Sequence, residues 1–162
     1  MKGVLVGLGN PIVGDDSIGI RVVEAIKDSK EIPDNFTIIP DASLGGLPLV
    51  ELIRGFDKAI IVDAVETRKA PPGSVKILNL SQYENSLHLS DFHNMDFFTA
   101  LEFARQYYAD VPDDITVIGI EIENKFEFSD ELSENLAQKF PEIVRKVIEY
   151  INISSKEIVA NV

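Results

Sequence analysis

Hydrophobic residues along the chain fall into short continuous runs that alternate with segments of helical periodicity. An apolar run bounded by turn residues is typical of a strand buried on both faces of a sheet. The first, third and last runs have this character, whereas the fourth alternates between apolar and polar residues. Five strands are therefore predicted, at Val4–Leu8, Phe36–Pro40, Ala59–Val62, Val75–Leu80 and Ile115–Ile120.

Between these runs, apolar residues recur three or four positions apart, which is the spacing of one helix face. Asp15 or Asp16 is expected to cap the first helix and Asn94 a later one, because their side chains accept hydrogen bonds from free backbone amides. Pro141 is expected in an N-terminal turn rather than in a helix interior. The predicted helices are Asp16–Lys27, Leu47–Arg54, Asn94–Tyr107 and Glu131–Ile151, with Ser81–Asp91 a polar connection.

This order of elements predicts one α/β domain over residues 1–153, followed by a loose tail at residues 154–162. Alternating strands and helices favour a largely parallel sheet with helices on both faces. Val75–Leu80 is expected at an edge of that sheet, because Lys76 interrupts its apolar positions. Ligands of parallel sheets bind beyond the carboxyl ends of the strands, so chemistry is expected at that edge.

Composition narrows the classes of function open to a chain of 162 residues. The absence of cysteine excludes disulfides, iron–sulfur clusters, zinc–cysteine sites and a cysteine nucleophile. No apolar run is long enough to cross a membrane, and the N-terminal run leads into a glycine turn rather than a cleavage site, so a cytoplasmic protein is expected. A net charge of −12, without a run of Lys or Arg, argues against a nucleic-acid partner.

The segment GLGNPIVGDDSIGIR, residues 7–21, has only the first half of a phosphate-binding loop. Gly7 and Gly9 fit the dinucleotide fingerprint, but Ile12 occupies the position of its third glycine. The two aspartates that follow would repel a pyrophosphate at a helix N-terminus. A Walker-A loop is excluded because no Gly-Lys-Ser/Thr sequence follows.

Three side chains capable of binding a metal are expected at the carboxyl edge of the sheet. Asp16 follows the first strand, Asp63 follows the third, and His93 precedes a helix. Two carboxylates and an imidazole suit a divalent transition metal, whose open positions would allow water activation. Each residue also has an ordinary role open to it, as a helix cap, a turn residue or a partly buried histidine. His88, in a polar connection, is expected at the surface.

The order of the motifs resembles that of the hydrogenase maturation endopeptidases. The resemblance begins with the glycine–aspartate segment and extends in family order over nearly the whole chain. The motifs that follow are IIVDAVE at 60–66, PPGSV at 71–75, HNM at 93–95 and VIGIEIE at 117–123.

This resemblance implies a three-layer α/β/α sandwich around a five-stranded, mostly parallel sheet with one antiparallel strand. It implies an aspartyl-type endopeptidase that removes a short C-terminal peptide from the nickel-loaded large-subunit precursor of a [NiFe] hydrogenase. Asp16, Asp63 and His93 match the family residues that act in catalysis and contact the nickel. The nickel then arrives with the precursor and is not a resident cofactor, and the protease is expected to be a monomer.

Two positions depart from the family pattern. Many members have glycine where this chain has Ser17, and many have glutamate where it has Asp16, whose side chain is shorter by one methylene. The small-residue segment DASLGGL adds Asp41, Gly45 and Gly46 as secondary candidates for the site.

Two other functions stay open. Peptidyl-tRNA hydrolases also begin with a strand that ends in GLGNPG, although Ile12 replaces the last glycine here and the negative charge does not suit tRNA. A nickel-dependent chaperone that binds the precursor without cleaving it is the other alternative, because no standard protease nucleophile is evident. Ser17 in particular lacks a G-x-S-x-G context.

Overall fold

The computed structural model describes the chain except for residues 43–44, 87–91, 124–127 and 161–162, and gives only the backbone of residues 86, 92–96 and 157–160. Its strands are β1 (Gly3–Leu8), β2 (Phe36–Ala42), β3 (Lys58–Val65), β4 (Val75–Leu78) and β5 (Asp114–Glu121). Its helices are the 3-10 turn η1 (Gly14–Ser17) and α1 (Ile18–Ser29), α2 (Gly46–Ile53), α3 (Leu80–Ser86), α4 (Phe92–Tyr107) and α5 (Glu134–Ala160). All five strands expected from the sequence are present.

The strands form one mixed sheet in the order β2-β1-β3-β5-β4. Pairing is parallel between β1 and β2, between β1 and β3 and between β3 and β5, whereas β4 pairs antiparallel with β5 at the edge. Gly7 of β1 pairs with Val62 of β3, and Asp63 of β3 pairs with Gly119 of β5. The carboxyl ends of the parallel strands therefore meet at one edge of the sheet.

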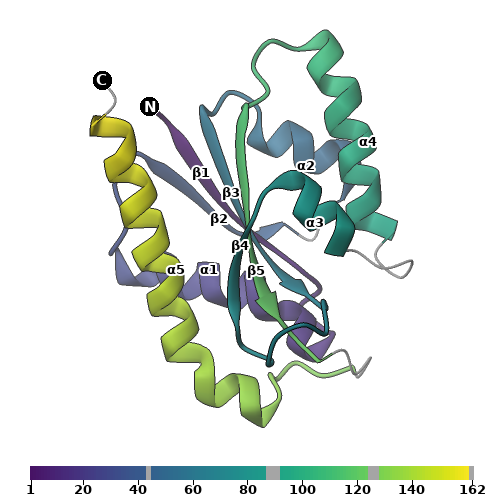
Figure 1. Ribbon diagram of the computed structural model, residues 1–162, viewed down its shortest axis with the longest axis vertical. Coiled ribbons are helices and arrows are strands. Elements are labelled where there is room, and N and C mark those ends of the chain that lie inside the picture. Colours follow the sequence, from purple (N-terminus) through teal and green to yellow (C-terminus); the bar gives the residue numbers. More distant parts are fainter. Residues whose placement is uncertain (43–44, 87–91, 124–127, 161–162) are drawn as a thin grey trace.

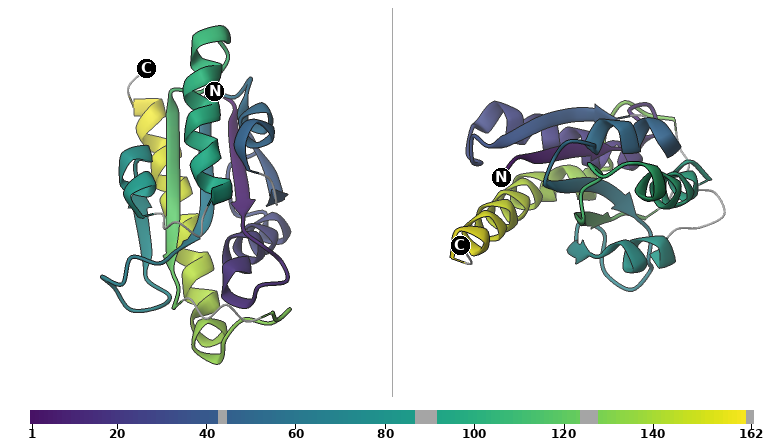
Figure 2. Two further views of the ribbon diagram at one scale, coloured as in Figure 1. Left: turned by 90° about the vertical axis from the view of Figure 1, so that its right-hand side faces the viewer. Right: turned by 90° about the horizontal axis from the view of Figure 1, so that it is seen from above.

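Helices cover both faces of the sheet, which makes three layers (Figures 1 and 2). Successive residues of a strand point to opposite faces. Val4 and Val6 accordingly join the apolar core under α2, α3 and α4, whereas Leu5 joins the core under α1 and α5. The predicted sandwich is confirmed. No helix in the described part of the chain is long and apolar enough to cross a membrane.

The polar segment after β4 was expected to be a connection, but it contains the helix α3. Asn79 and Gln82 start this helix with a reciprocal pair of bonds, in which each side-chain oxygen accepts the other residue's backbone N–H at 2.8–2.9 Å. Such a capping box compensates for the weak apolar periodicity of a short polar helix. The expected cap at Asn94 is wrong as well, because α4 begins at Phe92.

The last helix is longer than its sequence suggested. Pro141 lies in the interior of α5, not in an N-terminal turn. Buried Leu136 and Ile143 lie on either side of it, so packing against the sheet offsets the hydrogen bond that proline cannot make. Residues 154–160, expected as a loose tail, continue the helix, and buried Ser154 bonds to the carbonyl oxygen of Ile151.

Candidate active site

The structure places Asp16 and Asp63, from separate parts of the chain, on two elements in contact near the carboxyl edge of the sheet. Asp16 lies in η1, which follows β1 and contacts β3. Asp63 lies in β3, one residue beyond the Val62 that pairs with Gly7 of β1. The two acids thus come from neighbouring parallel strands at their carboxyl ends, where ligands of such sheets bind.

Two glycines allow the backbone of this edge to pack closely. Gly9 has a φ of 149°, and a Cβ there would overlap the carbonyl oxygen of Asp16. Gly19, in the first turn of α1, lies so close to the sheet that a Cβ would overlap the carbonyl oxygens of Leu8 and Val62. Gly9 was recognisable in the sequence as a turn residue, whereas Gly19 was not singled out. The only sequence signal for Gly19 was that a small residue stands among the apolar positions of a predicted helix.

Neither acid of the aspartate pair caps the helix that follows, because both lie within η1 and the N-terminal flanking residue of α1 is Ser17. Asp15 instead accepts a 2.7 Å hydrogen bond from the backbone N–H of Ser133, immediately before α5. Half-buried Asp16 accepts a 3.1 Å bond from the N–H of Asn10 within its own loop. Asp15 thus joins two parts of the fold, whereas Asp16 is held by the loop at the edge of the sheet.

Ser17 is buried and its hydroxyl is engaged on both sides. It donates to the carbonyl oxygen of Gly14 at 2.6 Å and accepts from Nε of Arg21 at 2.8 Å. The guanidinium of Arg21 also donates to the carbonyl oxygen of Asp130. In this chain the serine therefore links η1 to the segment before α5, a structural role in keeping with its lack of a nucleophile motif.

Asp63 was expected to follow its strand, and that expectation is wrong. The strand continues to Val65, and Asp63 is only 2% exposed. One carboxylate oxygen accepts the N–H of Ala64 at 2.8 Å, and the other accepts the hydroxyl of Tyr83 at 2.5 Å. Tyr83 lies in α3 and was missed because that helix was read as a polar connection; the capping box was the signal that could have found it.

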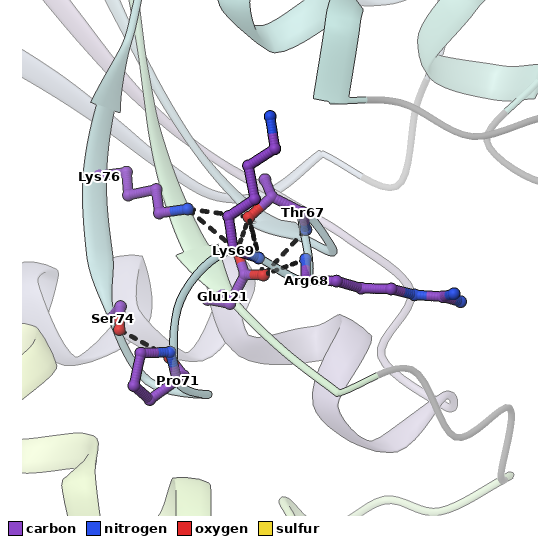
Figure 3. A network of polar contacts seen from close by, with 7 residues as sticks. All are labelled: Thr67, Arg68, Lys69, Pro71, Ser74, Lys76 and Glu121. Carbon is purple, nitrogen blue, oxygen red and sulfur yellow. Dashed lines mark hydrogen bonds and ion pairs between the residues drawn. The ribbon is translucent and has the colours of Figure 1, made fainter.

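A second buried carboxylate, Glu121 at the end of β5, orders the connection between β3 and β4 (Figure 3). It accepts the N–H of Thr67 at 2.9 Å, the N–H of Arg68 at 2.8 Å and the hydroxyl of Thr67 at 2.9 Å. Lys76, expected to guard an exposed edge, turns inward, with its ammonium 3.6 Å from Glu121 and 2.8 Å from the Thr67 hydroxyl. The side chain of Arg68 extends away from this cluster and pairs with Glu66.

The remaining candidates are only partly described. The backbone of His93 lies in the first turn of α4 rather than before the helix, and its side chain lies outside the described residues, as does the whole of His88. Asp41 is exposed near the end of β2, Gly45 flanks α2 and Gly46 begins it. Among the side chains that the structure describes, no three of His, Cys, Asp and Glu lie close enough to hold a metal.

A family model described as "Hydrogenase maturation protease" matches residues 20–150. The chain belongs to the hydrogenase maturation protease family. Among its relatives, the hydrogenase 2 maturation protease of Escherichia coli is 28% identical over 124 residues, which are 74% of this chain and 73% of the relative. HupD, a hydrogenase expression/formation protein of Rhizobium leguminosarum, is 30% identical over 72% of this chain and 57% of its own length.

Solved structures of maturation proteases share this fold. The endopeptidase HybD of E. coli superposes with a TM-score of 0.78 at 24% identity, covering 95% of this chain and 94% of the other. HybD from Thermococcus kodakarensis has a TM-score of 0.69 at 19% identity over 94% of this chain. The resemblance carried by the motifs is thereby confirmed, and the protein is an enzyme, a hydrolase of the peptidase class.

Proposed function

We propose that this maturation protease removes a short C-terminal peptide from the nickel-loaded large-subunit precursor of a [NiFe] hydrogenase. The observation that carries the proposal is the placement of Asp16 and Asp63 on contacting elements near the carboxyl edge of the sheet in a member of this family. Gly9 and Gly19 support this placement, because the lack of a Cβ at each lets the backbone approach closely at this edge.

In this proposal Asp16, Asp63 and His93 contact the nickel of the precursor, which identifies a substrate ready for processing. The nickel belongs to the substrate, so the protease has no resident cofactor. Carboxylates and a neutral imidazole are suitable ligands for such an ion. Half-buried Asp16 is the more accessible of the two acids, and we assign it the first contact with the incoming substrate.

Docking through the metal would fix the scissile peptide bond beside the carboxylates, and proximity would supply much of the rate. A water activated by one carboxylate adds its oxygen to the peptide carbonyl carbon. The C–N bond then breaks, and the proton taken from the water passes to the leaving amine. The engaged hydroxyl of Ser17 has no part in this scheme.

The protease is proposed to act in the cytoplasm as a monomer and without nucleic acid. A chain without cysteine needs no oxidising compartment. Its net charge of −12 would oppose a polyanionic partner.

The test is to mix purified protein with nickel-loaded and nickel-free precursor and to record intact masses over time. We expect a defined C-terminal peptide to be lost only from the nickel-loaded form. Asp16→Asn and His93→Ala should each slow processing by at least about 100-fold, whereas Asp28→Asn, a change in an exposed acid at the far end of α1, should not.

Three outcomes would contradict parts of this proposal. Nickel-dependent binding without loss of mass would place the protein among chaperones. Unchanged processing by both Asp16→Asn and His93→Ala would refute the assignment of the site. Hydrolysis of peptidyl-tRNA in place of the precursor would favour the other hydrolase.

A further inference from the structure

We propose that Tyr83 is a positioning residue for Asp63, and that it thereby sets how tightly the protease binds its nickel-bearing substrate. This inference rests on the proposed function, in which Asp63 contacts the nickel. Tyr83 itself would touch neither nickel nor the scissile bond. It would act through the carboxylate of Asp63.

The contact between the two residues is short and buried. The hydroxyl of Tyr83 lies 2.5 Å from one carboxylate oxygen of Asp63, and the side chains are 1% and 2% exposed. Hydrogen bonds from a hydroxyl to an ionised carboxylate are among the strongest in proteins. Because the N–H of Ala64 binds the other oxygen at 2.8 Å, the two donors together fix the plane of the carboxylate.

Tyr83 is itself held rigidly by the core. The capping box of Asn79 and Gln82 starts α3, and the N–H of Tyr83 bonds to the carbonyl oxygen of Asn79 at 2.9 Å. Its ring packs at 5.7 Å from that of Phe98 in α4. The position of the hydroxyl is therefore set by packing and not by solvent.

A phenylalanine would fill the same space in this apolar core without bringing a polar atom into it. Buried tyrosines carry their hydroxyl at a desolvation cost and normally use it for a hydrogen bond. Here the hydroxyl reaches an acid twenty residues earlier in the chain, on a different element. Residues that orient a metal-contacting side chain are an established part of metal recognition, and their loss typically costs 10–100-fold in affinity or activity.

The experiment compares wild-type protein with Tyr83→Phe, which keeps the ring against Phe98 and removes only the hydroxyl. The matched control is Tyr107→Phe, the same change at a ring that is 68% exposed. Dissociation constants for nickel-loaded and nickel-free precursor are measured, together with kcat, KM and the melting temperature. We expect Tyr83→Phe to weaken binding of the nickel-loaded form by about 10–100-fold and to leave binding of the nickel-free form unchanged.

A double-mutant cycle separates positioning from a merely structural role. In an Asp63→Ala background, Tyr83→Phe should have no further effect on nickel-dependent binding, because the carboxylate that Tyr83 positions is gone. A lower melting temperature with wild-type affinity for the nickel-loaded precursor would overturn the inference. So would an equal loss of affinity for both forms of precursor. If wild-type protein itself fails to process the precursor, the proposed function is what fails.

Discussion

The two acids of the site are built in different ways. Asp16 lies in a turn made by residues close to it in sequence, with Gly9 beneath it and the N–H of Asn10 on its carboxylate. Asp63 lies inside β3, almost fully buried, and its carboxylate depends on Tyr83 from a helix that follows later. One acid is thus held locally and the other by tertiary packing, so they should differ in what their loss does to stability.

The largest effect on stability and processing is expected from a substitution that prevents α1 from packing closely against the sheet, because the arrangement of both acids would then be lost. A Cβ at Gly19 would overlap backbone oxygens of both β1 and β3, which cannot move without disturbing the sheet. We expect Gly19→Ala to lower the free energy of unfolding by about 3 kcal/mol and to prevent processing. Denaturant unfolding and the precursor assay measure both effects.

Gly55→Ala is the control for Gly19→Ala. It adds the same methyl where nothing lies within 4 Å, although its φ of 78° carries a strain of its own. It should cost only about 1–2 kcal/mol and should leave processing intact. A Gly19→Ala protein as stable and as active as wild type would show that close packing of α1 is not needed.

Replacing each acid by alanine tests directly whether the two acids differ in their contribution to stability. Asp63→Ala leaves the buried hydroxyl of Tyr83 without its acceptor, so we expect a loss of about 3 kcal/mol in the free energy of unfolding. Asp16→Ala removes the acceptor of the Asn10 N–H at a half-buried position and should cost about 1 kcal/mol. Both should lose processing, measured by the mass of the precursor. Equal effects on stability would mean that the two acids are not held differently.

A smaller effect on stability is expected at Arg68, in the connection after β3, because its backbone lies in the left-handed region. Arg68 has a φ of 57°, and its N–H is bound by Glu121. Arg68→Gly should raise the free energy of unfolding by about 1 kcal/mol, because glycine adopts this conformation without steric cost. The ion pair with Glu66 that is lost involves an exposed guanidinium and contributes little. Thermal unfolding measures the change.

Lys30→Gly is a matched control for that prediction. Lys30 has the same φ of 57°, at the C-terminal cap of α1, where glycine is favoured. A similar gain is expected there, without any contact to Glu121. A gain at Lys30 and a loss at Arg68 would mean that the arginine side chain stabilises the connection in a way that the backbone does not explain.

The smallest effect concerns an exposed pair outside the site. The guanidinium of Arg54 bonds to Asp110 at 2.9 Å and lowers the pKa of that carboxyl. A carboxyl with a depressed pKa in the folded state stabilises the fold above its unfolded pKa, and this contribution is lost as the pH falls through the folded value. Wild-type protein should therefore lose slightly more stability below about pH 4 than Asp110→Asn. Asp113→Asn, at a neighbouring exposed acid, should behave like wild type.

The sequence by itself was sufficient for the elements whose signals are local. Continuous apolar runs located β1, β3 and β5, because strands buried on both faces exclude polar residues, and alternation located the edge strand β4. The glycine turn and the two acids after β1 and in β3 were recognisable, as was the family from the order of the motifs. The sandwich followed from the alternation of strands and helices and from that resemblance.

Tertiary structure decided which role each polar residue takes. Asp15 binds before α5 and not at its own helix, Lys76 turns inward to Glu121, and Pro141 is accommodated within a helix. Each of these outcomes depends on a partner distant in sequence or on packing against the sheet. Neither kind of contact produces a hydrophobic periodicity that can be recognised in the sequence. The same reason hid Tyr83. A hydroxyl aimed at a buried carboxylate is visible only once α3 has been packed against the sheet.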